Sequence, residues 1–168
     1  MAYRYTVFDT KLGWMAIAAS EGGLVRLTLP QPAADKAMVL ISDLLPKATA
    51  NTGSFRDVIA RIERYLDGEQ VEFPDPLDLS QWTEFQRQVW RLVSTVPYGQ
   101  TRTYAWVAEQ LGRPGSVRAV GQALARNPLP IIIPCHRIVG SSGKLVGFSG
   151  DLELKKRLLA LEAASQKR

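Results

Sequence analysis

Cys135 and His136 are the only residues of their kinds in this 168-residue chain, and they are neighbours. A cysteine becomes a strong nucleophile once a nearby base or cation removes its proton, because the thiolate and not the thiol attacks carbon. Adjacent side chains of a strand point to opposite faces and could not cooperate, but Pro134 favours a turn or a helix start here. The alternative is a buried thiol beside an imidazole on the surface, and the pair alone does not decide between the two.

A histidine that acts as a base needs a third group to fix its tautomer. In the predicted last helix, residues 152–164, Glu162 lies eight positions after Leu154 on the same apolar face as Leu158 and Leu161. A carboxylate on an apolar stripe should be paired. We therefore expect Glu162 to orient His136, the alternative being a frayed helix end in solvent.

The composition limits the kinds of chemistry that the site can use. One cysteine excludes an internal disulfide, and a single cysteine with a single histidine is too few for a structural zinc site, so we expect no metal and no cofactor. With 46% apolar and 22% charged residues the chain is an ordinary globular one. It has neither an apolar run near the ~18 residues of a membrane span nor the pattern of a signal peptide, so we expect a cytoplasmic protein.

The formal charge of +5 is unevenly distributed along the chain. Residues 1–81 hold 8 Lys and Arg against 11 Asp and Glu, whereas residues 82–168 hold 13 against 5. The first part is therefore net −3 and the second net +8. A basic half joined to an acidic half indicates a polyanionic partner for the second half, although a generic basic surface would look the same.

The first half alternates apolar and polar residues over 3–7, 12–19 and 24–29, which predicts an antiparallel meander with one buried face. In the third run we expect Val25, Leu27 and Leu29 on one face and Arg26 and Thr28 on the other. Helical stripes follow over 38–45 and over 55–66, with Ser54 as the expected cap of the second. The extended stretch 73–80 then reads as the connection between a domain of residues 1–80 and a domain of residues 81–168.

The second half is mostly helical. Thr83 and Gln86 predict a capping box for a helix that ends near Pro97. Two short helices over 103–111 and 116–126, joined by Gly112-Arg113-Pro114-Gly115, suggest a helix-turn-helix, and the basic charge favours this over an ordinary helical hairpin. The expected fold class is thus α/β (α+β), with a small sheet first and helices after it.

Several motifs in the second half stand at characteristic distances. They are Arg118-Ala119-Val120-Gly121, Asn127-Pro128, Ile133-Pro134-Cys135-His136-Arg137-Ile138, Gly143, Phe148-Ser149-Gly150 and Leu158-Leu159-Ala160-Leu161-Glu162. This set resembles the signature of the O6-alkylguanine-DNA alkyltransferases, and the similarity is continuous from Phe85 to Glu162. It implies a ribonuclease-H-like N-terminal domain and a C-terminal domain with a winged-helix-like helix-turn-helix. It also implies direct-reversal repair, in which the alkyl group of O6-alkylguanine, and of O4-alkylthymine if that lesion is accepted, moves irreversibly to the protein.

The resemblance assigns a chemical role to five residues. Cys135 would accept the alkyl group, and His136 would draw its proton through a water molecule. Glu162 would hold the histidine, and Asn127 would brace the turn before the cysteine. Tyr104 would donate a hydrogen bond to guanine N3 as the base leaves, the alternative being a core aromatic.

The resemblance also implies contacts with DNA in the minor groove. Arg118 would enter the duplex and fill the gap left by the flipped nucleotide, because guanine O6 cannot be reached inside the stack. Ser116, Val117 and Thr103 would lie beside the backbone. Gly121 would allow close approach to DNA, although tight helix packing is an equal alternative.

The pocket for the flipped base would be lined by Leu124, Ile138, Phe148 and Ser149. Several relatives carry tyrosine where this chain has Phe148, so the ring can still stack on guanine but the hydroxyl is missing. This difference bears on the breadth of substrates. The expected partner is double-stranded DNA with O6-alkylguanine, bound by a monomer.

Three other functions compete with alkyl transfer. An alkyltransferase-like protein that binds damaged DNA without repairing it would lack Cys135, which is present. A hydrolase built on Cys135, His136 and Glu162 would need an oxyanion hole, for which the sequence offers no candidate. A helix-turn-helix regulator without chemistry would be indifferent to loss of Cys135.

Overall fold

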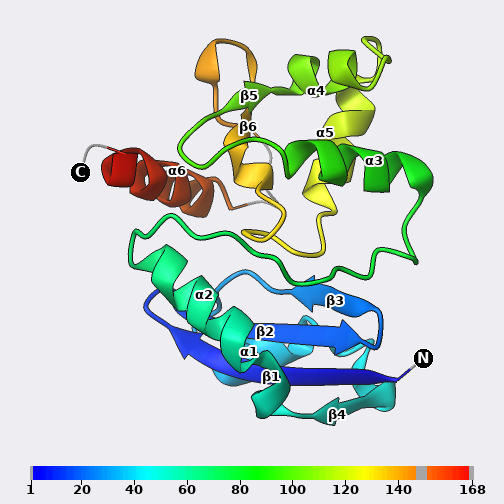
Figure 1. The fold of residues 1–168 in the computed structure, drawn as a ribbon, viewed down its shortest axis with the longest axis vertical. Helices are drawn as coiled ribbons and strands as arrows, with labels where there is room; N and C mark the ends of the chain where they lie inside the picture. The colour runs from blue at the N-terminus through cyan, green and yellow to red at the C-terminus, as the bar shows by residue number, and fades with distance from the viewer. Residues whose placement is uncertain (1, 147–150, 167–168) are drawn as a thin grey trace. The chain divides into compact units, whose positions relative to one another are not determined.

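A computed structural model describes residues 2–146 and 151–166 (Figure 1). The chain divides into two compact units, residues 1–81 and 82–168. None of the helices in the described residues is long and apolar enough to cross a membrane.

The first unit is a four-stranded sheet in the order β3-β2-β1-β4, covered by helices. Its strands are β1 (Tyr3–Thr10), β2 (Gly13–Ser20), β3 (Gly23–Leu27) and β4 (Ala48–Ala50). Its helical segments are α1 (Ala34–Val39), η1 (Leu45–Lys47), η2 (Thr52–Phe55) and α2 (Arg56–Leu66). The predicted antiparallel meander is confirmed for β1, β2 and β3. β4 was not foreseen and pairs parallel with β1, so the sheet is mixed.

β2 is the centre of this unit, and its residues 15–20 are all buried. Ala16 packs with Ala37 and Ile41 of the α1 region on one face of the sheet, and α2 lies across the other face (Figure 1). A strand that is covered on both faces reads as continuously apolar, because neither set of alternate side chains meets water.

Two details of the first unit correct the sequence prediction. Thr28, which was expected on the polar face of the third run, is buried, because it lies opposite Ala16 on the face that Ala37 and Ile41 cover. Its Oγ1 accepts a hydrogen bond of 2.8 Å from the Ala16 N–H, which satisfies the buried hydroxyl. Ser54 is not a cap: the side chain of Asn51 accepts from the Ser54 N–H and begins η2, which runs into α2.

The segment after α2 is extended, as predicted, and runs beside the start of β3. The Leu24 N–H donates to the Pro76 carbonyl, and the Asp78 N–H donates to the Leu24 carbonyl, both at 2.8 Å. A Cβ on Gly23 would stand 2.4 Å from the Pro76 oxygen, so only glycine permits this approach.

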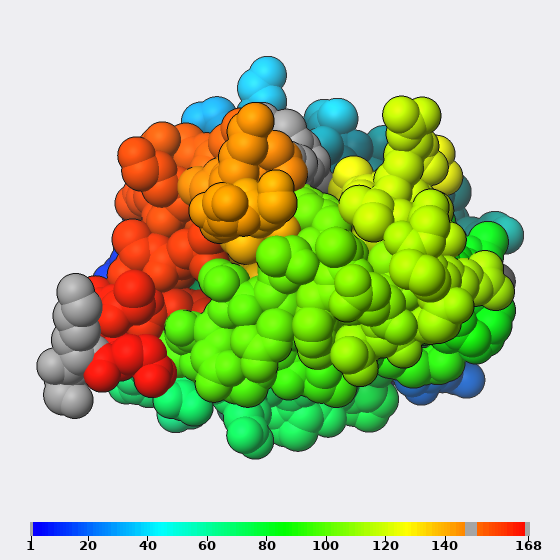
Figure 2. All heavy atoms as spheres, turned by 90° about the horizontal axis from the view of Figure 1, so that it is seen from above, coloured from blue at the N-terminus to red at the C-terminus, as the bar shows by residue number. Residues whose placement is uncertain are grey.

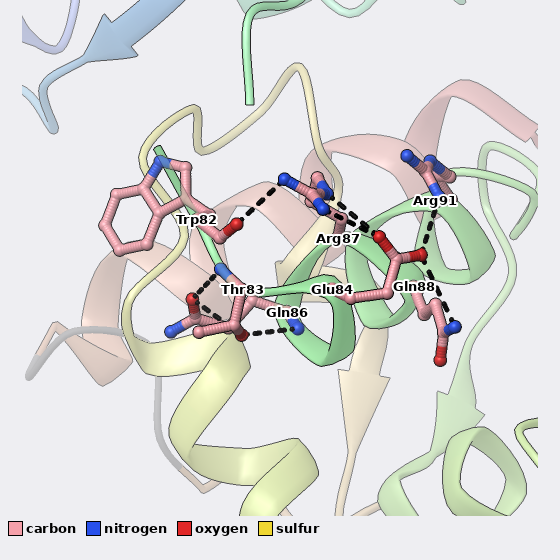
Figure 3. A network of polar contacts seen from close by, with 7 residues as sticks. All are labelled: Trp82, Thr83, Glu84, Gln86, Arg87, Gln88 and Arg91. Carbon is pink, nitrogen blue, oxygen red and sulfur yellow. Dashed lines mark hydrogen bonds and ion pairs between the residues drawn. The ribbon is translucent and has the colours of Figure 1, made fainter. Parts of the chain in front are cut away.

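The second unit is built mainly from helices. They are α3 (Glu84–Val93), α4 (Tyr104–Gln110), α5 (Val117–Ala125) and α6 (Leu152–Gln166), with short segments β5 (Arg102–Thr103), η3 (Cys135–Arg137), β6 (Ile138–Val139) and η4 (Ser141–Gly143). The predicted capping box of Thr83 and Gln86 is confirmed and begins α3 (Figure 3). Figure 3 also shows Glu84 between Arg87 and Arg91, which ties the first turns of this helix together.

α4 and α5 pack against each other around a turn that includes Gly112 at φ 73°, which confirms the predicted helix-turn-helix. Trp90 of α3 is fully buried, and its Nε1–H donates to the Ala123 carbonyl at 3.0 Å, so α3 holds α5 in place. The short parallel pairing of β5 with β6 joins Thr103, at the start of α4, to Val139, just after η3. This pairing places the start of α4, where Tyr104 lies, beside the segment that follows Cys135 and His136.

Candidate active site

Cys135 begins the 3₁₀ turn η3, directly after Pro134. The sequence prediction of a turn rather than a strand at this point is therefore confirmed. The cysteine is buried, with 5% of its surface exposed, and its N–H donates to the Ile133 carbonyl at 2.7 Å. The preceding loop includes Ile131 at φ 76°, a backbone conformation that β-branched residues rarely adopt. This loop therefore depends on other contacts to hold its shape.

Asn127 supplies those contacts. Its Oδ1 accepts from the Leu129 N–H at 2.8 Å, and its Nδ2 donates to the Ile133 carbonyl at 2.9 Å. The same Nδ2 donates to Cys135 Sγ at 3.0 Å. One amide side chain thus fixes the loop and points an N–H donor at the sulfur, where it would stabilise a thiolate more than a thiol.

His136 and Glu162 form a buried pair. Nε2 of the histidine lies 2.5 Å from Oε2 of the glutamate, and the two side chains are 0% and 1% exposed. The helical stripe that suggested Glu162 is seen in α6, where Leu154, Leu158 and Glu162 are buried on one side.

Arg137 completes this cluster. Its Nε donates to Glu162 Oε1 at 2.9 Å and its second terminal nitrogen to Oε2 at 3.2 Å. A fourth donor, the Gly99 N–H, reaches Oε1 at 2.9 Å. So many N–H donors require the carboxylate to be ionised, since a protonated carboxyl accepts fewer hydrogen bonds. Glu162 is therefore an anion whose position is fixed from several sides.

Lys155 is a buried cation that the sequence analysis missed. It lies on α6 one residue after Leu154, and it is 1% exposed. Its Nζ donates to the carbonyls of Ile138 at 2.6 Å and Val146 at 2.9 Å, and to the Tyr104 hydroxyl at 3.4 Å. A signal that could have found it is its position on the helix, three residues before Leu158 and seven before Glu162, which places it on their side.

Tyr104 begins α4 and faces this lysine. Its hydroxyl donates to the Val146 carbonyl at 2.7 Å, and the lysine ammonium lies 5.6 Å from its ring centre. Burial raises the pKa of Tyr104, and the nearby Cys135 thiolate would raise it further. The hydroxyl is therefore a proton donor and not a phenolate at neutral pH.

The electrostatics of the cluster favour a neutral resting thiol. Burial raises the pKa of Cys135 to about 11, against the lowering effects of the Asn127 amide and the Lys155 ammonium. Burial lowers the pKa of Lys155 to about 8, with Cys135 as the opposing influence. The thiol therefore needs a proton acceptor before it can attack carbon.

His136 can be that acceptor. Burial lowers the pKa of its imidazole, so the ring rests without the extra proton, whereas Glu162 acts in the opposite direction and favours the protonated ring. With Nε2 hydrogen-bonded to an ionised carboxylate, Nε2 carries the proton and Nδ1 is the ring atom that can accept one. The arrangement can take a proton from a neighbouring thiol and stabilise the imidazolium that results.

The predicted DNA-contacting residues belong to α5 or directly precede α4 and α5. Figure 2 shows these segments, coloured light green to yellow-green, over much of the face in view. Val117 and Arg118 are exposed at the start of α5, and Ser116 precedes them without a side-chain capping bond. The Thr103 hydroxyl caps α4 by accepting from the Trp106 N–H at 3.0 Å, so this side chain has a structural role as well. A Cβ on Gly121 would meet only a Tyr104 ring carbon at 4.0 Å, so helix packing does not require glycine here.

Leu124 and Ile138, which were expected to line the base pocket, are both buried in this unit. Phe148 and Ser149 lie outside the described residues. Within residues 2–146 and 151–166, no group of three or more His, Cys, Asp or Glu side chains is placed to hold a metal ion.

Together these features define a class of protein in which a buried thiol, surrounded by an asparagine, a histidine and a glutamate, lies in the same compact unit as a helix-turn-helix. The family model for the 6-O-methylguanine DNA methyltransferase ribonuclease-like domain matches residues 3–79, and the model for the DNA binding domain of the same proteins matches residues 84–164.

Relatives match over nearly the whole chain. The methylated-DNA–protein-cysteine methyltransferase of Mycolicibacterium paratuberculosis is 40% identical over 158 residues, which are 94% of this chain and 91% of that protein. The constitutive enzyme of Bacillus subtilis is 38% identical over 97% of each chain. The crystal structure of Mycobacterium tuberculosis OGT in complex with DNA is similar with a TM-score of 0.81 and 38% identity, covering 98% of this chain and 94% of that one. This chain therefore belongs to the 6-O-methylguanine DNA methyltransferase family, and the resemblance found in the sequence is confirmed.

Proposed function

We propose that this protein repairs O6-alkylguanine in duplex DNA by moving the alkyl group to Cys135 Sγ, once per polypeptide. The observation that carries the proposal is the buried thiol that accepts a hydrogen bond from Asn127, next to a histidine fixed by Glu162. Family membership and the likeness to a DNA complex support DNA as the partner.

The chemistry is a single displacement. The Cys135 proton passes to His136, the thiolate attacks the alkyl carbon, an S–C bond forms, and the bond from that carbon to guanine O6 breaks with its electron pair going to the base. The Tyr104 hydroxyl turns from the Val146 carbonyl to donate its proton to guanine N3. Lys155, 3.4 Å from that hydroxyl, can replace the proton. The thioether product is a very poor leaving group, so the protein is consumed.

The base has to leave the duplex to reach a thiol this deeply buried. Arg118 projects from the start of α5 and, in this proposal, fills the gap that the nucleotide leaves. Val117, Ser116 and Gly121 present small side chains or none, which suits a helix in the narrow minor groove. We further propose that Leu124, Ile138, Phe148 and Ser149 line the pocket for the extruded base.

Intact-mass measurement after incubation with O6-methylguanine duplex DNA tests the proposal. We expect one added methyl group, about 14 Da, from replacing S–H by S–CH3 at a thiol nucleophile. Product should stop at one equivalent of active protein even with lesion DNA in excess. Cys135→Ser is the matched control, which should bind DNA without transfer. Continued turnover, or the label on another residue, would contradict the proposal, and a protein that binds lesions unchanged would be a recognition module instead.

A further inference from the structure

The hydrogen-bond donors around the Glu162 carboxylate include a charged guanidinium, an imidazole ring and a neutral backbone N–H. Arg137 and the Gly99 N–H approach Oε1, while His136 and Arg137 approach Oε2. The remaining terminal nitrogen of Arg137 donates to the Val96 carbonyl at 2.9 Å, and the guanidinium lies 5.6 Å from the Tyr98 ring centre. The arginine is 9% exposed and is held on three sides, so its charge stays beside the carboxylate.

The balance of charge around His136 follows from these positions. A guanidinium stays protonated in proteins, so Arg137 and Glu162 together are neutral. A proton on His136 would leave this buried cluster with one net positive charge, which burial opposes. Among residues 2–146 and 151–166, the charged and titratable groups found near the ring are Glu162 and Lys155 from α6, with Cys135 and Arg137 from its own turn. Glu162 favours the imidazolium, whereas Arg137 and Lys155 oppose it.

We propose that Arg137 is a positioning residue that holds the Glu162 carboxylate and neutralises its charge, so that His136 rests as a neutral imidazole with its proton on Nε2. Without the arginine, an isolated buried carboxylate would draw a proton from solvent onto the histidine, and the acceptor of the Cys135 proton would already be filled. Arg137 thereby sets the lower limit of pH at which the site is ready. The link to the Cys135 proton rests on the proposed function, but the protonation state of His136 does not.

The chain holds a single histidine, so one NMR resonance reports the protonation of this ring without ambiguity. In the wild-type protein without DNA, we expect His136 to stay neutral as the pH falls well below the ordinary histidine pKa of about 6.5. Arg137→Gln should raise the midpoint by about one pH unit or more, which is at least a tenfold gain in proton affinity. Arg137→Lys keeps the positive charge and should stay close to wild type.

The matched control is Arg126→Gln, which removes one positive charge from an exposed position of the same unit and should leave the midpoint unchanged. The reaction rate with free O6-benzylguanine should fall as the pH is lowered, with the same midpoint as the titration of the NMR resonance. This midpoint should move to higher pH only in Arg137→Gln. A change in rate by the same factor at every pH would indicate a merely structural role and overturn the proposal.

Two further outcomes would also overturn it. One is a wild-type His136 that is already an imidazolium at pH 7, and the other is an Arg137→Gln midpoint equal to that of wild type. If Arg137→Gln does not fold, the wild-type titration still tests the proposal, because an imidazolium at pH 7 would overturn it. If the protein fails to transfer alkyl groups, the proposed function falls while the NMR result still stands or fails by itself.

Discussion

Asn127→Ala would test how the loop before Cys135 is held. The substitution removes the partner of the Leu129 N–H and one partner of the Ile133 carbonyl, and those two residues are 0% and 1% exposed. The Leu129 N–H would be left without a partner, which costs about 1–3 kcal/mol, whereas the Ile133 carbonyl keeps the Cys135 N–H and loses one ordinary hydrogen bond worth about 0.5–1.5 kcal/mol. Together they predict a loss of about 1.5–4.5 kcal/mol in the free energy of unfolding. The weak N–H···S bond adds less than about 1 kcal/mol.

Urea and thermal denaturation would measure this loss. For a unit of this size, each kcal/mol corresponds to about 4–8 °C in Tm, so the shift should be at least about 6 °C. Asn51→Ala is the matched control, because Asn51 makes one exposed capping bond to the Ser54 N–H and should cost only about 0.5–2 kcal/mol. Since the Asn127 amide lowers the pKa of Cys135, the variant thiol should also react more slowly with iodoacetamide at fixed pH. A stability within about 0.5 kcal/mol of wild type would refute the view that this side chain holds the loop.

Four other substitutions separate structure from recognition and chemistry. Gly121→Ala should leave the protein as stable or about 1 kcal/mol more stable by helix propensity, yet weaken DNA binding; equal DNA affinity would remove the close-approach explanation. Arg118→Ala should slow repair of duplex DNA far more than reaction with free O6-benzylguanine, and equal losses on both substrates would make Arg118 structural. Glu162→Gln should slow transfer strongly with DNA binding nearly intact. It should also cost about 3–5 kcal/mol of stability, because the buried Arg137 loses its carboxylate partner. A single-turnover rate within about twofold of wild type would exclude Glu162 from the mechanism. Arg113→Gln should lower the slope of log Kd against log salt concentration by about one, because we expect this exposed guanidinium in the turn of the helix-turn-helix to contact a phosphate. An unchanged slope would place it away from DNA.

The sequence predicted the parts of the fold and of the site that follow from local pattern. Glu162 was identified because a carboxylate on an apolar helical stripe needs a partner, and Thr83 with Gln86 because a capping box is set by four consecutive residues. The turn at Pro134 followed in the same way from the restricted backbone of proline.

What the sequence did not reveal depends on contacts between distant segments. Lys155 is buried because two backbone carbonyls, at Ile138 and Val146, need a donor, and nothing near Lys155 in the sequence announces them. The strand β4 is three residues long and is specified only by its register with β1. Thr28 is buried because it lies opposite Ala16, whose face of the sheet is covered by Ala37 and Ile41, and an alternating pattern in one strand does not reveal that both faces are covered.

The burial of Cys135 affects how long the protein stays able to accept an alkyl group before it meets a lesion. Oxidants and disulfides react with the thiolate, and a thiol that is 5% exposed with a pKa of about 11 presents almost none at neutral pH. Because the protein can act only once, this low reactivity keeps it active for longer. Peroxide or glutathione disulfide would otherwise oxidise the thiol and inactivate the protein before it had repaired a lesion. Intact protein exposed to millimolar peroxide should therefore keep its full methyl-accepting capacity long after an exposed cysteine has been oxidised.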